Sequence, residues 1–167
     1  MVESGCKWIC GVVKLMPWKV KWKAMFMGEY LHSIDAKGRM RMPAKFRDDL
    51  GEKFVVTKGT GKCLFVFTTE EWQIFSQKLR TLPLTDRNVQ AFVRMLYAGA
   101  SELELDAQCR ILLPQNLREY AELEKDVYVI GVANRVEIWS AKNWSEYNEA
   151  SADNFDEVLG RMAELGI

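Results

Sequence analysis

Basic side chains cluster in the stretch SIDAKGRMRMPAKFR, directly after an aspartate and around a glycine. Asp35 can organise a turn by accepting hydrogen bonds from backbone N–H groups, and Gly38 permits the positive φ that a tight turn needs. Lys37, Arg39 and Arg41 stand at alternate positions, so on a strand they would share one face. Such a face can bind phosphate, or it can bind guanine O6 and N7 through arginine in the major groove of DNA.

The same frame of residues returns 71 positions later, in the stretch ELDAQCRILLPQNLREYA. After one inserted residue the match continues at an offset of 72, as far as Trp72 and Trp144. The body of the chain is therefore predicted to be two copies of one unit, at 28–80 and 99–150. The identical pairs in the first part of the match are Asp35 and Asp106, Ala36 and Ala107, Arg39 and Arg110, Pro43 and Pro114, and Arg47 and Arg118.

Each Asp-x-x-x-Arg pair allows two interpretations. Asp35 with Arg39, and Asp106 with Arg110, could form internal salt bridges that hold the turns. Alternatively, a pair of such hairpins could form a basic two-stranded ribbon that fits the major groove. The two can coexist, because a carboxylate that holds a turn can also orient an arginine. The residues alone leave both interpretations open.

Each copy predicts the same order of elements: a lead strand, a turn, a short strand, a helix that begins at proline, two further strands and a final helix. Gly51 is a good C-cap for the helix in PAKFRDDL, and Thr68 and Glu71 have the spacing of a capping box. The sequence therefore predicts a small, β-rich mixed α/β fold. The predicted strands are GEYLHSI, RMRM, KFVVTK and CLFVF in the first copy, and SELEL, RILL, DVYVIG and VEIW in the second.

Two amphipathic segments accompany the copies, since their apolar residues recur at helical spacing. We expect a connecting helix within 81–98 and a C-terminal helix within 151–167, packed either on the body of their own chain or on a neighbouring subunit, with packing within the monomer as the default. The apolar stripe of the first is Val89, Phe92, Val93 and Leu96, and that of the second is Phe155, Val158, Leu159 and Met162.

Charge is unevenly distributed in this chain of 167 residues, although the formal net charge is zero. Residues 1–24 carry five lysines and one acid, so the remainder has a net charge of −4. A nucleic-acid function must therefore rest on a local basic patch. We interpret residues 1–24 as an unstructured extension or a misplaced start, with a membrane-surface segment as the alternative, because they show no clear period.

Motifs for catalysis and metal binding are weak. His32 is the only histidine, which leaves no Cys2His2 zinc site, and the sequence contains no GxSxG, Walker or HExxH motif. Asp35 and Asp106 could be imagined as paired catalytic acids, but turn formation explains them better. We therefore predict a protein that is not an enzyme and has no cofactor, metal, small-molecule substrate or membrane partner. We expect four reduced cysteines in the cytosol: Cys6, Cys10, Cys63 and Cys109.

The doubled Asp-x-x-x-Arg frame resembles the MraZ family of bacterial transcriptional regulators, as do the stretches GEYLHSIDAKGRMRMPAKFRDDLGEKFVVTKG and AGASELELDAQCRILLPQNLREYAELEKDVYVIGV. The resemblance covers roughly residues 25–167. It implies two tandem SpoVT/AbrB-like modules, each a swapped-hairpin barrel half, that pair as an intramolecular pseudo-dimer with flanking helices. It also implies a ring-shaped homo-oligomer that is cytoplasmic and nucleoid-associated.

The resemblance further implies a sequence-specific DNA-binding regulator that acts as a repressor. Its partner would be double-stranded promoter DNA with short direct repeats, in the division and cell-wall gene cluster and including its own promoter. By motif match Arg39 and Arg110 would contact DNA, helped by Lys37, Arg41 and Gln108. The alternative is a ring that binds no DNA and serves structure or protein interaction.

The second turn departs from the family pattern in two ways. Cys109 stands where the family has glycine; if that position needs a positive φ, cysteine costs about 1 kcal/mol or the turn relaxes. Gln108 replaces Lys37 and Leu112 replaces Arg41, so the second hairpin is less basic. We therefore expect the first copy to dominate DNA contact.

Overall fold

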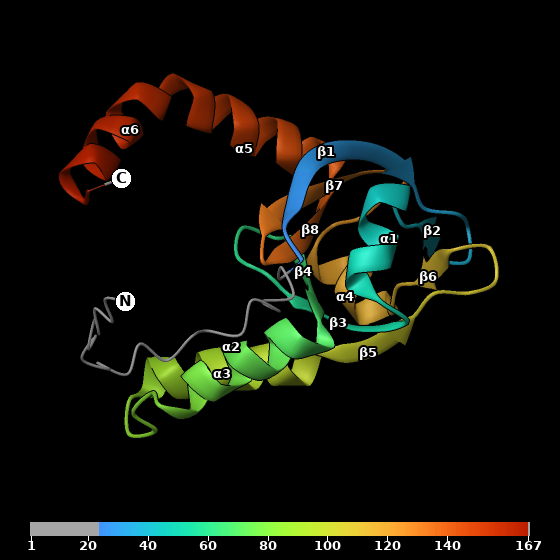
Figure 1. The fold of residues 1–167 in the computed structure, drawn as a ribbon, viewed down its shortest axis with the longest axis horizontal. Coiled ribbons are helices and arrows are strands. Elements are labelled where there is room, and N and C mark those ends of the chain that lie inside the picture. The colour runs from blue at the N-terminus through green and yellow to red at the C-terminus, as the bar shows by residue number, and fades with distance from the viewer. Residues whose placement is uncertain (1–23, 167) are drawn as a thin grey trace, which may run out of the picture.

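The computed structural model describes residues 24–166, and its strands form a six-stranded sheet and a separate two-stranded ribbon (Figure 1). Of residues 1–24, only Ala24 belongs to the described part of the chain. The predictions for that segment, and for Cys6 and Cys10 within it, therefore lie outside the described residues. The strands are β1 (Phe26–Ser33), β2 (Arg39–Arg41), β3 (Lys53–Lys58), β4 (Leu64–Thr68), β5 (Ser101–Glu104), β6 (Arg110–Leu112), β7 (Asp126–Ala133) and β8 (Arg135–Ser140). The helices are α1 (Ala44–Leu50), α2 (Thr69–Arg80), α3 (Arg87–Gly99), α4 (Gln115–Tyr120), α5 (Ala141–Asp153) and α6 (Phe155–Glu164).

The sheet interleaves strands from the two copies of the repeat. Its order is β1-β7-β8-β4-β3-β5, and neighbouring strands are antiparallel. Exchanging the copies maps β1 onto β5, β7 onto β3 and β8 onto β4, so the order reads the same in both directions. β1 pairs with β7 along its whole length and β5 pairs with β3, so each lead strand lies beside the other copy. The predicted mixed α/β fold of two tandem repeats is confirmed.

The main core lies between one face of the sheet and the layer formed by β2, β6, α1 and α4 (Figure 1). Alternation along the strands explains this placement. In β4, Leu64 and Val66 belong to this core, whereas Phe67 lies on the other face and stacks on Phe75 of α2. That second face is covered by α2 and α3 over β3 and β4, and by α5 over β7 and β8.

Two of the predicted helix caps are present, and two prolines are shifted by one position. Thr68 accepts a hydrogen bond from the backbone N–H of Glu71 at 3.1 Å, and Gly51 ends α1 with a φ of 77°. Pro43 and Pro114 are N-caps rather than first helical residues. The N–H that proline lacks is dispensable at either position, because the first donors of a helix have no intrahelical partner.

Helix α6 does not pack on the body of the chain. It follows α5 after Asn154, buries none of its residues and projects from one end of the molecule (Figure 1). The expectation of packing within the monomer is therefore wrong for α6, whereas α3 lies on β3 and buries Leu96. Phe155, Val158 and Leu159 leave an apolar stripe on α6 exposed.

Candidate nucleic-acid interface

The β2–β6 ribbon presents arginine on its outer face. The two strands are antiparallel, and their central residues, Met40 and Ile111, are buried in the core. Because side chains alternate across a strand, the flanking residues of both strands share the outer face. These residues are Arg39, Arg41, Arg110 and Leu112. The ribbon and the turns that precede it lie at the end of the molecule opposite α6 (Figure 1).

Asp35 holds the first turn. Its Oδ1 accepts hydrogen bonds from the backbone N–H groups of Lys37 and Arg39, both at 2.9 Å, and its Oδ2 accepts from Nε of Arg39 at 2.8 Å. The N–H of Gly38 closes the turn by donating to the carbonyl of Asp35 at 2.9 Å. Lys37 therefore lies in the turn, and of the three basic residues predicted to share a strand face only Arg39 and Arg41 belong to β2.

The second turn repeats this geometry around Asp106. Its Oδ1 accepts from the backbone N–H groups of Gln108 at 2.8 Å and Arg110 at 2.9 Å. Its Oδ2 lies 2.8 Å from both Nε and Nη2 of Arg110. Asp-x-x-x-Arg is thus a structural unit in which the aspartate builds the turn and fixes an arginine at the first residue of the following strand.

The carboxylates of both turns are held in the ionised form. The backbone N–H of Arg39 lowers the pKa of Asp35, and the guanidinium of the same residue lowers it further. Arg110 lowers the pKa of Asp106 in the same two ways. Both groups are therefore charged at neutral pH and cannot donate a proton there. The arginine side chains keep 31% and 25% of their surface exposed, so the ion pairs leave them open to a further partner.

Arg41 and Arg110 are direct cross-strand partners on the ribbon. Like charges placed opposite each other on a sheet destabilise the pair. Among residues 24–166, Arg41 forms no ion pair with an acidic side chain that could offset this repulsion. An anion bound between the two guanidinium groups would relieve the repulsion through charge-assisted hydrogen bonds. This arrangement therefore suits phosphate or the acceptor atoms of guanine.

Backbone hydrogen bonds tie each turn to the other copy of the repeat. The carbonyl of Gly38 accepts from the N–H of Leu113 at 3.0 Å, and the carbonyl of Cys109 accepts from the N–H of Met42 at 3.1 Å. Both turn residues have a positive φ, 83° for Gly38 and 58° for Cys109. The second turn therefore does not relax around its cysteine, and an L-residue in this conformation carries strain of about 1–2 kcal/mol.

Arg47 and Arg118 hold the backbone just after β2 and β6, a role that sequence reasoning did not assign to them. Nε of Arg47 donates to the carbonyl of Met42 at 2.8 Å, and Nε of Arg118 donates to the carbonyl of Leu113 at 3.1 Å. A Cβ on Gly38 would lie only 2.7 Å from Cζ of Arg118, so the glycine allows a close approach as well as a positive φ. The identity of the two arginines across the repeat is the signal that could have found them.

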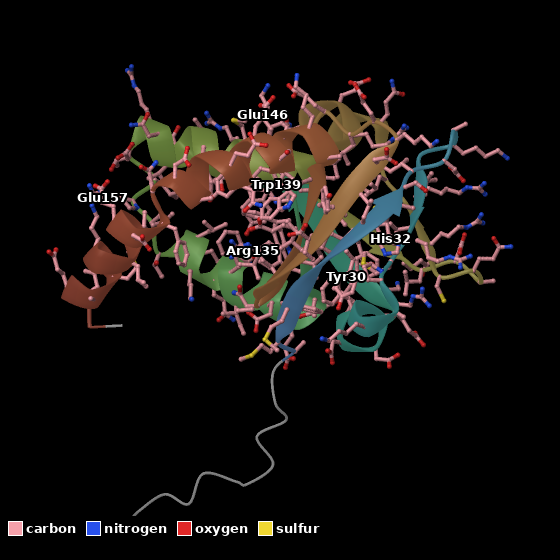
Figure 2. The ribbon with its side chains drawn as sticks, turned by 90° about the horizontal axis from the view of Figure 1, so that it is seen from above. Tyr30, His32, Arg135, Trp139, Glu146 and Glu157 are labelled. Carbon is pink, nitrogen blue, oxygen red and sulfur yellow. The ribbon has the colours of Figure 1, made fainter. Side chains whose placement is uncertain are left out.

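Burial determines the state of His32 and Cys63. His32 is half-buried on β1, toward the end of the sheet that carries the turns (Figure 2). Burial lowers its pKa, and the positive charges of Arg47 and Arg41 lower it further, so the imidazole is neutral at neutral pH. Burial raises the pKa of the Cys63 thiol to about 12. A thiol that stays protonated is a poor nucleophile, so Cys63 is a structural residue.

Within residues 24–166, no group of three or more histidine, cysteine, aspartate or glutamate side chains is placed to hold a metal ion. Over the same part of the chain, no helix has both the length and the apolar character needed to cross a bilayer. The absence of a metal or membrane partner for the whole chain stays a prediction.

Comparison with known proteins points to one family. The family model described as “MraZ protein, putative antitoxin-like” matches residues 25–95 and again residues 96–165. Proteins named “Transcriptional regulator MraZ” are similar over 143 residues, which is 86% of this chain and 100% of each relative. The identity is 54% for the protein of Alkaliphilus metalliredigens, 56% for that of Acetivibrio thermocellus and 54% for that of Clostridium beijerinckii.

Proposed function

The chain belongs to the MraZ family of transcriptional regulators, and from this premise we propose that it binds DNA in a sequence-specific manner through the β2–β6 ribbon. The observation that carries the proposal is the outer face of this ribbon, where Arg39, Arg41 and Arg110 lie together. A two-stranded ribbon fits the major groove of B-DNA, where arginine binds guanine or reaches the flanking phosphates. Lys37 and Gln108 would contact the DNA backbone from the two turns.

The first copy of the repeat would provide most of the contact. Its strand carries Arg39 and Arg41 and its turn carries Lys37, whereas the second strand carries Arg110 as its one basic residue. A single ribbon with so few basic side chains gives limited affinity. Several subunits that dock on one DNA fragment would multiply their affinities, which allows an acidic protein body to bind DNA.

The proposed target is double-stranded promoter DNA that carries short direct repeats. The family resemblance supports the promoter of the division and cell-wall gene cluster as this target, including the chain's own promoter, with repression as the outcome. A regulator of this kind would act in the cytoplasm, on the nucleoid. Direct repeats suit a ring of identical subunits, because the ring presents one ribbon after another at regular spacing.

Binding to the DNA upstream of the chain's own coding sequence is expected to weaken steeply as salt rises. Each phosphate contact releases counterions, so log K falls by about 0.9 per contact for each unit of log salt concentration. With a few contacts in each of several subunits, we expect a loss of about 10³-fold or more between roughly 50 and 200 mM salt. Fluorescence anisotropy measures this slope, with an unrelated fragment of equal length as the specificity control. An affinity that stays constant over this range contradicts the proposal.

A ring that binds no DNA is the second candidate function. The ion pairs of Asp35 with Arg39 and Asp106 with Arg110 favour it, because each arginine already has a structural partner. In that case the arginines only brace the turns. The two candidates differ in what the loss of Arg39 does: it strongly weakens DNA binding in the first and lowers only thermal stability in the second.

A ring-shaped homo-oligomer is the remaining part of the proposal. The apolar stripe of α6 is not covered by any residue of the described chain, and exposed apolar patches of this kind mark interaction sites. Because α6 projects from one end of the molecule, it would bind a different surface on the neighbouring subunit (Figure 1). Such head-to-tail contacts generate a ring when the rotation between subunits closes.

Replacement of Leu159 by aspartate is expected to dissociate this oligomer. Leu159 is 57% exposed, so the new charge leaves the monomer fold intact, but at a subunit contact it would be buried and unpaired at a cost of about 3–5 kcal/mol. Gly160→Asp is the matched control, because an added Cβ there meets nothing within 4 Å and the position faces away from the stripe. Size-exclusion chromatography with light scattering measures the mass. An unchanged mass for Leu159→Asp contradicts the role of α6.

A further inference from the structure

Leu112 interrupts the arginine face of the β2–β6 ribbon. It is the direct cross-strand partner of Arg39, and it lies two residues after Arg110 on the same face. Its residue surface is 57% exposed. Within the described residues, β2 and β6 carry no other large apolar side chain that is exposed. The leucine is therefore an isolated apolar group among guanidinium groups.

The internal repeat shows what this position holds in the other copy. Leu112 corresponds to Arg41 at the offset of 71, and the pairing of β2 with β6 relates the two positions by the approximate twofold symmetry of the ribbon. An arginine at position 112 would make the outer face symmetric and fully basic. The outer face is asymmetric instead, because the side chain of Leu112 cannot form a hydrogen bond. A lone exposed leucine is common on protein surfaces, so its position among the proposed DNA contacts carries the argument.

We infer that Leu112 contacts the C5-methyl group of a thymine and thereby contributes to sequence specificity, an inference that rests on the proposed DNA-binding function. In the major groove, base pairs present hydrogen-bond donors and acceptors, and the thymine methyl group is the apolar feature. Direct cross-strand partners have Cβ atoms about 4.5–5.5 Å apart, so a docked ribbon brings Leu112 to the same region of the groove as Arg39. The two side chains would then reach neighbouring bases, one by hydrogen bonding and the other by apolar contact.

Arginine and leucine would have different roles on the ribbon, because one side chain is charged and the other is apolar. Arg41 and Arg110 attract any DNA, because phosphate is present at every base pair. Leu112 attracts only a site that places a methyl group beneath it. Burying one methyl group is worth about a fourfold gain in affinity for each docked subunit, and these factors multiply when several subunits bind together. A weak contact in one ribbon therefore becomes an appreciable preference in the assembly.

The test compares DNA with and without thymine methyl groups. The fragment upstream of the coding sequence is amplified once with dTTP and once with dUTP, since uracil lacks only the methyl group. The full chain and its Leu112→Ala variant are titrated against both fragments at one salt concentration. We expect the unmodified chain to bind the uracil fragment about fourfold more weakly per docked subunit. We expect Leu112→Ala to bind the thymine fragment about as weakly, with little further loss on the uracil fragment.

A second variant, Leu112→Arg, keeps the test decisive if alanine perturbs β6. It restores the symmetric basic face, so we expect a salt slope steeper by about 0.9 per docked subunit and the loss of the preference for thymine over uracil. The inference is wrong if both variants keep the thymine-to-uracil affinity ratio of the unmodified chain. If the unmodified chain binds neither fragment, the proposed function itself is wrong. The ratio thus tests the role of Leu112 separately from DNA binding as such.

Discussion

Replacement of Arg39 by alanine is expected to lower the affinity for promoter DNA by more than about 100-fold while the oligomer stays intact. An arginine that contacts guanine or phosphate contributes about 1–3 kcal/mol in each subunit, and these losses add up over the subunits that dock on one fragment. The turn survives the change, because Oδ1 of Asp35 still accepts the N–H groups of residues 37 and 39. An exposed ion pair of this kind contributes little to stability because solvent screens it, so folding is little affected.

Arg87→Ala is the matched control for this experiment. It removes the same charge from the start of α3, and the connection between α2 and α3 lies at the end of the molecule away from the ribbon (Figure 1). A gel shift with the upstream DNA, run beside a light-scattering measurement of mass, compares the two variants. If Arg39→Ala shifts the fragment as well as Arg87→Ala does, the ribbon is not the DNA-binding surface. If Arg39→Ala lowers only the melting temperature, the ring that binds no DNA is the better function.

Replacement of Gly38 by alanine is expected to destabilise the fold by about 2 kcal/mol. An L-residue at a φ of 83° carries about 1–2 kcal/mol of strain. The new Cβ would also displace the side chain of Arg118 and weaken its hydrogen bond to the carbonyl of Leu113, worth about 0.5–1.5 kcal/mol. The lower entropy of the unfolded chain offsets about 0.4–1 kcal/mol of this loss. Calorimetry should record a melting temperature about 4–8 °C lower.

Cys109→Gly is the opposite change at the equivalent position and is expected to have the opposite sign. It removes the strain of a cysteine at a φ of 58° and adds entropy to the unfolded chain, for a net gain of up to about 1 kcal/mol. The two variants together separate backbone conformation from other effects of mutation. Equal shifts of the same sign would show that the positive φ does not control the stability of these turns.

The turns were predictable from the sequence because the interactions that build them are local. Asp35 and Arg39 are four residues apart, and the hydrogen bonds that join them need no other part of the chain. The caps at Thr68 and Gly51 are local in the same sense. The roles of these residues follow from their types and spacing. The repeat strengthens the prediction for the turns, because the same frame occurs twice.

Contacts between the two copies of the repeat could not be predicted from local sequence patterns. The guanidinium of Arg118 lies against Gly38, eighty residues earlier in the chain, and no periodicity encodes that approach. The same limit applies to α6. Its stripe of apolar residues shows that one face avoids water, but the pattern does not say which surface covers that face. The expectation of packing on the chain's own body was therefore wrong for physical reasons, since a helix period carries no information about the partner.

The pairing of β1 with β7 has a consequence for synthesis of the chain on the ribosome. Residues of β1 leave the ribosome about a hundred residues before their partners in β7, as Phe26 and Ala133 show. At about 5–20 residues per second, the first strand waits about 5–20 s for its neighbour. During this interval the edge of β1 that later pairs with β7 is unpaired, and Phe26, which is buried in the finished fold, is still accessible. The same strand of a nascent chain on a neighbouring ribosome could then pair with this edge in place of β7. Rapid elongation and binding of chaperones to the nascent chain should therefore matter more for the yield of this protein than for a fold built from adjacent hairpins.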